Sequence, residues 1–220
     1  MLSAIILAAG KGTRMRSVLP KVLQPLGGRP LLHHVIDTAQ SLQARQTVVV
    51  AGFGLEAVQA ACTDYAVNWA VQAQQLGTGH AVAQAIAHIQ DDETALILYG
   101  DVPLIQSATL ARLVDLVDDR HPLALLTVTL PDPTGYGRIV RDASGSMLRI
   151  VEQKDANPEE RAITEVNTGI MAAKGSQLRG WLAQLGNDNS QGEYYLTDII
   201  AMAVADGFMV RSTQASSEME

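Results

Sequence analysis

Short apolar runs alternate with segments of helical spacing through the first 130 residues of the chain. Runs of apolar or β-branched residues indicate buried strands, and they occur at 5–9, 47–51, 67–71, 95–99 and 123–130. Apolar residues that recur every three or four positions predict helices, and they occur at 31–42, 58–62, 81–89 and 110–117. This alternation is typical of an α/β fold, with a mostly parallel, Rossmann-like sheet and helices on both faces.

The pattern changes after Pro131. Two strand-like runs flank a polar turn at 142–146, which predicts a hairpin. The remaining elements expected are a strand at 166–173, helices at 178–185 and 196–204, and a last strand at 208–212. We therefore expect a single domain over 1–220, with a larger part at about 1–130 and a small mixed β subregion at about 131–220.

Composition narrows the classes of function. The net charge of −7 argues against a general nucleic-acid binder, because such binding depends on Lys and Arg neutralising phosphates. Cys62 is the only cysteine, which excludes an internal disulfide. It lies in an apolar helical pattern, so we expect its side chain to pack in the core. The amino terminus lacks a signal-peptide pattern and no apolar run reaches membrane-spanning length, which favours a reducing, cytoplasmic setting.

The first strand runs directly into a glycine-rich, basic loop at 10–21. Gly10 lets the backbone approach an anion closely, and Arg14 and Lys21 add positive charge, which together favour a bound phosphate. A Rossmann fingerprint would require a small residue in place of Met15, and a P-loop would require Gly-Lys-Ser/Thr at its end. The loop therefore predicts nucleotide binding of another kind, and its alternative is a plain strand-to-helix turn.

Two more polar segments follow strands of the predicted parallel sheet, where ligands bind beyond the carboxyl ends. In 72–80, Gln72 and the backbone near Gly77 offer donors and acceptors for a base edge, and Thr78 is expected to cap a helix. The alternative is a capped loop with solvated glutamines. Asp101, after Tyr99 and Gly100, provides a carboxylate suited to Mg²⁺ beside substrate phosphates, or else an acceptor that anchors its own turn.

The small subregion contributes polar groups suited to a sugar with hydroxyl and amide groups. They are Gly135–Arg138, Glu152, Asn167–Gly169 and Glu193–Asp198, and each alone is more often a turn, cap or solvated residue. The five histidines include no pair with metalloenzyme spacing, and no Gly-x-Ser-x-Gly elbow occurs.

Six motifs in order along the chain resemble the sugar-phosphate nucleotidylyltransferases. More narrowly they resemble the uridyltransferase domains of bacterial bifunctional N-acetylglucosamine-1-phosphate uridyltransferases and glucosamine-1-phosphate acetyltransferases. The motifs are Leu7–Met15 with Leu19-Pro20-Lys21, Gln72–His80, Tyr99–Pro103, Asp132–Arg138, Asn167–Gly169 and Gln191–Asp198. The resemblance covers nearly all 220 residues and is far more specific than the glycine loop alone.

The resemblance implies Mg²⁺-dependent transfer of UMP from UTP to N-acetylglucosamine 1-phosphate, giving UDP-N-acetylglucosamine for cell-wall precursors, and pyrophosphate. It assigns the phosphates to Arg14 and Lys21 and the metal to Asp101. It assigns the nucleotide to Leu7, Ala8, Gly10, Gln72, Gly77 and Thr78, with Tyr99 and Gly100 beside it, and the sugar to Gly137, Glu152, Asn167, Tyr195 and Thr197. A sugar phosphate is already an ionised nucleophile, so no catalytic triad is expected.

The sequence also departs from the family pattern. An asparagine that acts as a second metal ligand is expected shortly after the stretch that ends at Glu220, and the β-helix that bears acetyltransferase activity and forms a trimer is missing. We therefore expect a truncated, monomeric fragment with weakened Mg²⁺ binding and no acetyltransferase activity.

Three other readings stay open at this point. A sibling enzyme would use another base or sugar, as a glucose-1-phosphate thymidylyltransferase does. A non-catalytic domain would bind a nucleotide sugar without turning it over, and an NAD-dependent oxidoreductase is the most distant reading. Substrate panels, calorimetry and a pyrophosphate-release assay separate them.

Overall fold

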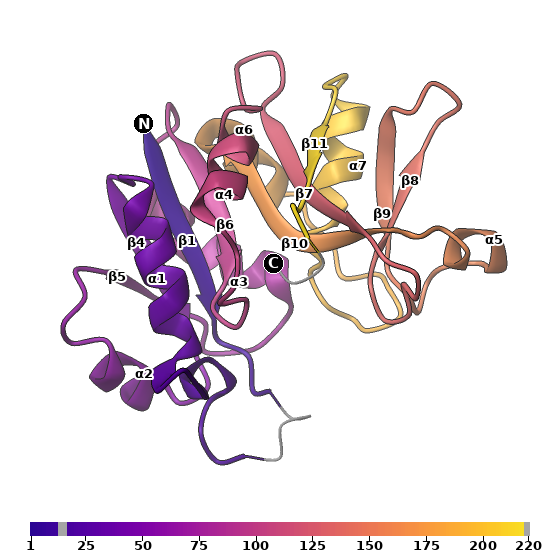
Figure 1. The fold of residues 1–220 in the computed structure, drawn as a ribbon. Coiled ribbons are helices and arrows are strands. Elements are labelled where there is room, and N and C mark those ends of the chain that lie inside the picture. The colour runs from indigo at the N-terminus through magenta and orange to yellow at the C-terminus, as the bar shows by residue number, and fades with distance from the viewer. Residues whose placement is uncertain (13–16, 218–220) are drawn as a thin grey trace.

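The computed structural model describes residues 1–12 and 17–217, and Figure 1 shows a central twisted sheet with helices on both sides. In this part of the chain the sheet has nine strands in the order β11-β7-β10-β6-β1-β4-β5, with β8 and β9 forming a ribbon off β10. The strands are β1 (Leu2–Ala8), β4 (Gln46–Ala51), β5 (Asn68–Val71), β6 (Thr94–Tyr99), β7 (Leu123–Thr129), β8 (Arg138–Arg141), β9 (Met147–Val151), β10 (Glu165–Lys174) and β11 (Arg211–Gln214).

The middle of the sheet is parallel. Strand β1 pairs in parallel with both β4 and β6, so that Ile5 lies beside Val48 on one side and Ile97 on the other. Strand β5 extends this parallel group beyond β4, whereas β10 runs antiparallel to both β6 and β7. The prediction of an α/β fold with a mostly parallel central sheet is confirmed.

Each central strand is buried on both faces, because successive side chains point to opposite sides of the sheet. Ile5 and Leu7 pack with α3 (Thr78–Ala85), α6 (Gly175–Leu182) and α7 (Asp198–Ala205) on one face. Ala4 and Ile6 pack on the other face against α1 (Leu31–Ser41), α2 (Leu55–Ala61) and α4 (Ser107–Val114). The helical stripes of the sequence therefore supply one apolar layer on each face, as predicted.

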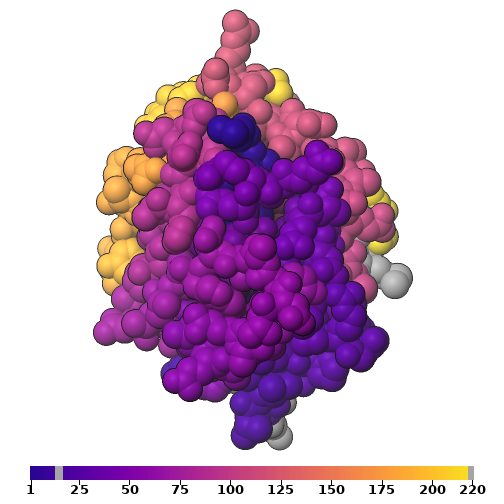
Figure 2. All heavy atoms as spheres, turned by 90° about the vertical axis from the view of Figure 1, so that its left-hand side faces the viewer, coloured from indigo at the N-terminus to yellow at the C-terminus, as the bar shows by residue number. Residues whose placement is uncertain are grey.

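The β5 edge belongs to the first half of the chain. Figure 2 shows this side of the molecule covered almost entirely by residues coloured indigo to magenta, with later residues only at the margins. At the opposite end of the sheet, Figure 1 shows the β8–β9 ribbon and the short helix α5 (Pro158–Arg161) standing apart from the parallel group. Arg141 joins the ribbon to β10 by donating to both carboxylate oxygens of Glu165, at 2.8 and 2.7 Å.

A buried carboxylate joins the amino-terminal ends of the central strands. Glu93 is fully buried, accepts from the Ser3 hydroxyl at 2.9 Å and from the Gln90 backbone at 3.1 Å, and forms an ion pair with Arg45. Burial on its own raises the pKa of Glu93, but these hydrogen bonds and the Arg45 charge together lower it below its usual value. This cluster lies at the end of the sheet opposite the carboxyl ends of the strands.

Several element boundaries differ from the sequence-based expectation. The strand predicted at 208–212 is β11, which begins at Arg211, because Phe208 packs edge-on against Trp181 with ring centroids 6.3 Å apart. The helix predicted at 81–89 ends as α3 at Ala85 and continues as the 3-10 turn η3 (Ile86–His88). The turn η2 (Lys21–Leu23), the small hairpin β2 (Pro25–Leu26) and β3 (Arg29–Pro30), and α5 have no counterpart in the prediction.

Within residues 1–12 and 17–217, no helix is long and apolar enough to cross a membrane. The thiol of Cys62 is buried, as its apolar pattern predicts, and burial raises its pKa to about 11.

Candidate active site

A cavity of about 330 Å³ opens at the carboxyl ends of the parallel strands, where an open α/β sheet binds its ligands. Nine of the predicted site residues line it, and they come from four separate segments of the chain. They are Leu7, Ala8, Gly10, Lys21, Gln72, Gly77, Thr78, Tyr99 and Asp101. Gly100, the tenth residue of this group, lies directly behind them, where its backbone donates to the Leu7 carbonyl at 2.9 Å. Arg14 lies outside the described residues.

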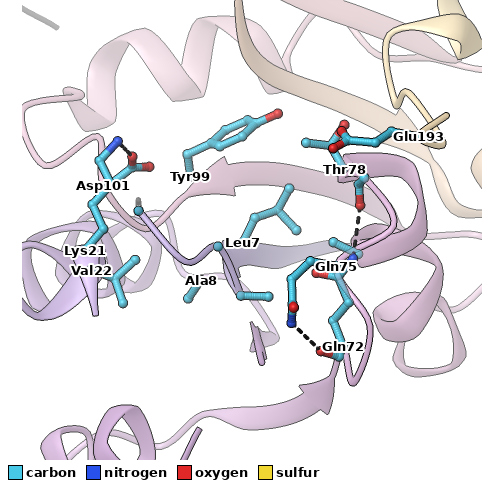
Figure 3. Close-up of a pocket in the computed structure, with 15 residues that line it drawn as sticks. Leu7, Ala8, Lys21, Val22, Gln72, Gln75, Thr78, Tyr99, Asp101 and Glu193 are labelled. Carbon is cyan, nitrogen blue, oxygen red and sulfur yellow. Dashed lines mark hydrogen bonds and ion pairs between the residues drawn. The ribbon is translucent and has the colours of Figure 1, made fainter. Parts of the chain in front are cut away.

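At one end of the cavity Lys21 and Asp101 form an ion pair (Figure 3). Lys21 begins the turn η2, and Asp101 lies two residues after the end of β6. Gly12 approaches Lys21 closely, since a Cβ at Gly12 would lie 2.7 Å from the Lys21 Cβ, and its φ of +58° suits glycine. The glycine loop therefore folds back onto the lysine, and the turn after β6 presents a carboxylate beside it.

The opposite end of the cavity is formed by the segment after β5. Gln72 is 3% exposed, and its side-chain nitrogen donates to the Gly77 carbonyl at 3.0 Å and lies 3.1 Å from His80 Nδ1. Gly77 has a φ of +112°, which an L side chain rarely adopts, so this turn depends on glycine. Figure 3 shows Gln72 and Gln75 side by side at this end of the cavity.

Thr78 does not cap its helix, contrary to the prediction. Gly77 is the N-cap residue of α3, and the Thr78 hydroxyl accepts instead from the Leu196 backbone at 3.1 Å. The reason is tertiary: residues 194–196 lie against the turn, and Tyr194 exchanges backbone hydrogen bonds of 2.8 Å with Leu76 and Gly79. The carboxy-terminal part of the chain thus holds the loop that the sequence assigned to the base.

The five predicted sugar-site residues gather behind this cavity and do not line it. Thr197 donates to Glu152 at 3.2 Å, and the Glu152 carboxylate lies 3.3 Å from where a Cβ of Gly137 would stand. The Asn167 backbone donates to the Gly137 carbonyl at 2.9 Å, and the Tyr195 hydroxyl accepts from Gln191 at 2.7 Å. Glycine at 137 therefore lets the backbone pack closely on Ile150 and the Glu152 carboxylate, since a Cβ there would lie 2.8 Å from Ile150 Cγ2.

Figure 3 shows Tyr99 on the wall of the cavity, between the Lys21–Asp101 pair and Thr78. Burial raises the pKa of its hydroxyl, and the charges of Glu152 and Asp101 raise it further, so the hydroxyl stays neutral. The ring packs on Gly169, where a Cβ would lie 2.5 Å from Cε2. Tyr99 therefore lines the predicted nucleotide cavity and also lies close to Glu152 of the predicted sugar site.

Negative charge concentrates around Glu152. Burial raises the pKa of Glu152, the nearby Asp155 and Asp198 raise it further, and the Thr197 hydrogen bond opposes them. Burial and Asp155 likewise raise the pKa of Asp198. A hydroxyl-rich ligand that donates hydrogen bonds to these carboxylates would suit this environment.

The sequence did not single out every residue that lines the cavity. Glu193 and Gln75 fall inside motifs already noted, so their position was available as a signal. Val22 and Ala81 form apolar wall and carry no signal beyond their hydrophobicity. In the described part of the chain, no group of three or more His, Cys, Asp or Glu side chains gathers to hold a metal ion.

The chain is an α/β domain with a cavity at the carboxyl ends of its parallel strands. The Lys21–Asp101 ion pair lies at one end of this cavity, and the Gln72–Gly77 turn lies at the other. The family profile described as the MobA-like NTP transferase domain matches residues 4–167, and the chain belongs to this family. It is therefore a nucleotidyltransferase domain.

Similar proteins agree with this class. Over its full length the chain is 60% identical across 219 residues to the bifunctional protein GlmU of Hydrogenovibrio crunogenus. It is 58% identical across 220 residues to the bifunctional protein GlmU of Cellvibrio japonicus. In both comparisons the chain spans 48% of the relative, or about half its length. The resemblance found in the motifs is confirmed.

Two solved structures share the fold. One is a UDP-glucose pyrophosphorylase complexed with UDP-glucose, with a TM-score of 0.78 and 16% identity, covering 97% of this chain and 90% of that one. The other is a putative glucose-1-phosphate thymidylyltransferase from Bacillus anthracis in complex with a sucrose, with a TM-score of 0.76 and 18% identity, covering 98% of this chain and 87% of that one.

Proposed function

We propose that this domain transfers UMP from UTP to N-acetylglucosamine 1-phosphate, giving UDP-N-acetylglucosamine and releasing pyrophosphate. The observation that supports the proposal is that one cavity has a pair of charged side chains at one end and a polar turn at the other. Lys21 and Asp101 lie at one end, and the Gln72–Gly77 turn lies at the other. A nucleoside triphosphate has the same two ends, a polyanion and a base.

The proposed reaction is a single displacement. A phosphate oxygen of the sugar phosphate attacks the α-phosphorus of UTP, and the bond from that phosphorus to the pyrophosphate oxygen breaks. No proton has to be removed from the nucleophile, so the protein contributes alignment and neutralisation of charge. Lys21 meets the phosphates as a point charge, and Arg14, whose position is outside the described residues, is proposed to act with it.

Asp101 is the residue we assign to Mg²⁺. A hard cation that binds substrate phosphates takes one or two protein carboxylates and completes its shell with phosphate and water oxygens. The Asp101 carboxylate in the cavity fits that requirement, and its present partner is a cation, Lys21. When bound, the metal would neutralise phosphate charge.

We assign the sugar to the group behind Tyr99. The Glu152 carboxylate would accept hydrogen bonds from sugar hydroxyl groups, and the Thr197 hydroxyl would exchange hydrogen bonds with them. Glycine at 137 lets the backbone lie close to this carboxylate. Asn167 and Tyr195 add an amide and a second hydroxyl. Burial raises the pKa of Glu152 because it disfavours the charged carboxylate, and hydrogen bonds from a polar ligand would offset part of this cost.

A pyrophosphate-release assay tests the proposal directly. UTP with N-acetylglucosamine 1-phosphate should support turnover in the presence of Mg²⁺, and dTTP or glucose 1-phosphate in place of either substrate should support less. Calorimetry with UTP and UDP-N-acetylglucosamine, each with and without Mg²⁺, separates binding from turnover. Binding without turnover would favour a nucleotide-sugar-binding domain, and preference for dTTP would favour a sibling thymidylyltransferase.

A further inference from the structure

We propose that His80 is a positioning residue that fixes the direction of the Gln72 amide, and through it selects a base with a ring N–H over a base with a bare ring nitrogen. The inference rests on the proposed function, because it concerns how the same cavity distinguishes nucleotides. His80 does not line the cavity, so it acts only through Gln72.

The direction of the amide follows from its neighbours. The Gly77 carbonyl can only accept, so the end of the Gln72 amide that lies 3.0 Å from it is the nitrogen. The same nitrogen lies 3.1 Å from His80 Nδ1. An amide nitrogen carries two hydrogens, and these two contacts use both of them.

The contact also fixes the tautomer of His80. Nδ1 must accept the second hydrogen of the Gln72 amide, so the neutral ring carries its proton on Nε2. A proton on Nδ1 would face a donor and favour rotation of the amide. With Nδ1 as an acceptor, His80 therefore works together with the Gly77 carbonyl to keep the amide nitrogen turned toward them and the amide oxygen free.

The Gln72 oxygen is the part of the amide that remains for a ligand. Gln72 lines the cavity, and within residues 1–12 and 17–217 no group donates a hydrogen bond to its Oε1. An acceptor held in this direction pairs with the N3–H of uracil or thymine. Cytosine presents a bare N3 at that position, which would place two acceptors face to face. Sites built to hydrogen-bond a donor discriminate strongly against analogues that lack it.

His80 is itself held in place. It lies in the first turn of α3, where its carbonyl accepts from Gln84 at 3.1 Å, and its ring centroid is 6.3 Å from that of Tyr194. Tyr194 is bound through its backbone to Leu76 and Gly79 on either side of the turn. The ring therefore meets Gln72 from a rigid position.

The test compares UTP with CTP. His80→Phe keeps an aromatic ring but removes the acceptor, so the ratio of kcat/KM for UTP over CTP should fall by about tenfold, which corresponds to about one neutral hydrogen bond. The loss should lie mainly in KM, because the base is far from the reacting phosphorus. In His80→Asn the side-chain oxygen can replace Nδ1, so the ratio should stay at the wild-type value. His88→Phe, on the turn after α3, is the matched control.

The outcomes are distinguishable. The inference would be overturned if His80→Phe kept the wild-type preference for UTP over CTP. It would also be overturned if His80→Asn lost this preference as much as His80→Phe does. Either result would leave the proposed function intact. A wild type that neither turns over UTP nor binds UMP in preference to CMP would remove the proposed function as well. Nitrogen NMR of the wild-type imidazole needs no variant: protonation at Nε2 supports the inference, and protonation at Nδ1 overturns it.

Discussion

Lys21 and Asp101 form an ion pair inside the cavity, although one begins a 3-10 turn and the other follows a central strand. The lysine side chain is 41% exposed and the aspartate 20%, so solvent weakens their mutual attraction. A pair of this kind adds little to folding, and the residues are proposed to serve the ligand. Substrate phosphates and a metal would each meet one member of the pair.

Replacing either member should therefore separate activity from stability. We expect Lys21→Met and Asp101→Asn each to lower turnover about 100-fold or more, because an electrostatic group aimed at the transition state is lost. The free energy of unfolding should change by less than about 1 kcal/mol. Pyrophosphate release and urea unfolding measure the two effects.

The control is Lys174→Met, which removes a pair with Asp119 of 3.0 Å that does not line the cavity. It should leave turnover at the wild-type rate. Near-normal transfer by Lys21→Met or Asp101→Asn would remove that residue from the proposed mechanism.

Glu93 should make stability depend on pH in acid. Its folded pKa is lowered by hydrogen bonds and the Arg45 charge, which outweigh the opposing effect of burial. The stabilisation is therefore present above the unfolded pKa and is lost as the pH falls through the folded pKa. We expect Glu93→Gln to lower the free energy of unfolding by about 2–3 kcal/mol at neutral pH. This loss lies between those found when a buried and an exposed ion pair are broken.

Urea unfolding across a pH series from neutral to acid measures this effect. The difference between wild type and Glu93→Gln should shrink as the pH falls, because both then carry a neutral side chain. Asp37→Asn, which breaks the exposed pair with Arg29, should cost less than about 1 kcal/mol. A Glu93→Gln deficit that stays constant with pH would contradict the assignment.

Glu152 should show the opposite linkage. Burial and two neighbouring carboxylates raise its pKa, so the folded state pays for its charge at neutral pH and recovers that cost as the pH falls through the folded pKa. Glu152→Gln should therefore fold at least as stably as the wild type. If the side chain holds the sugar as proposed, KM for the sugar phosphate should rise about tenfold or more while KM for UTP stays unchanged.

Varying one substrate at a time in the pyrophosphate-release assay separates these constants. Asp155→Asn is the matched variant, since it removes a charge that raises the pKa of Glu152 and keeps the carboxylate itself. It should leave KM for the sugar phosphate close to the wild-type value. An equal rise in both KM values for Glu152→Gln would contradict the sugar assignment.

The sheet and its two apolar layers could be predicted because each central strand and each covering helix carries its own periodic signal. The error at β11 has a physical cause: Phe208 and Val210 are apolar because they pack on the core, whereas β11 itself is the polar segment Arg211–Gln214 that pairs with β7 through its backbone. Backbone pairing of this kind leaves little trace in side-chain pattern.

The site was predictable as a set of residues and less so as an arrangement. Gln72 directly follows β5 and Asp101 lies two residues after β6, so their placement at the same edge of the sheet follows from parallel topology. The role of Thr78 could not be predicted, because its partner Leu196 approaches from far along the chain. The direction of the Gln72 amide likewise depends on where His80 lies once the turn has folded.

Gly169 offers a test of how tightly Tyr99 is held. Its φ is +86°, and a Cβ there would lie 2.5 Å from Cε2 and 2.9 Å from Cζ of the Tyr99 ring. Gly169→Ala should therefore cost both backbone strain and overpacking, about 2–4 kcal/mol together, and should also lower turnover because the ring must move. Gly145 has the same φ of +86° but open space around it, so Gly145→Ala should cost only the strain, about 1 kcal/mol. Thermal unfolding and pyrophosphate release on the two variants measure the difference, and equal losses of stability would show that Tyr99 yields to the added methyl group without cost.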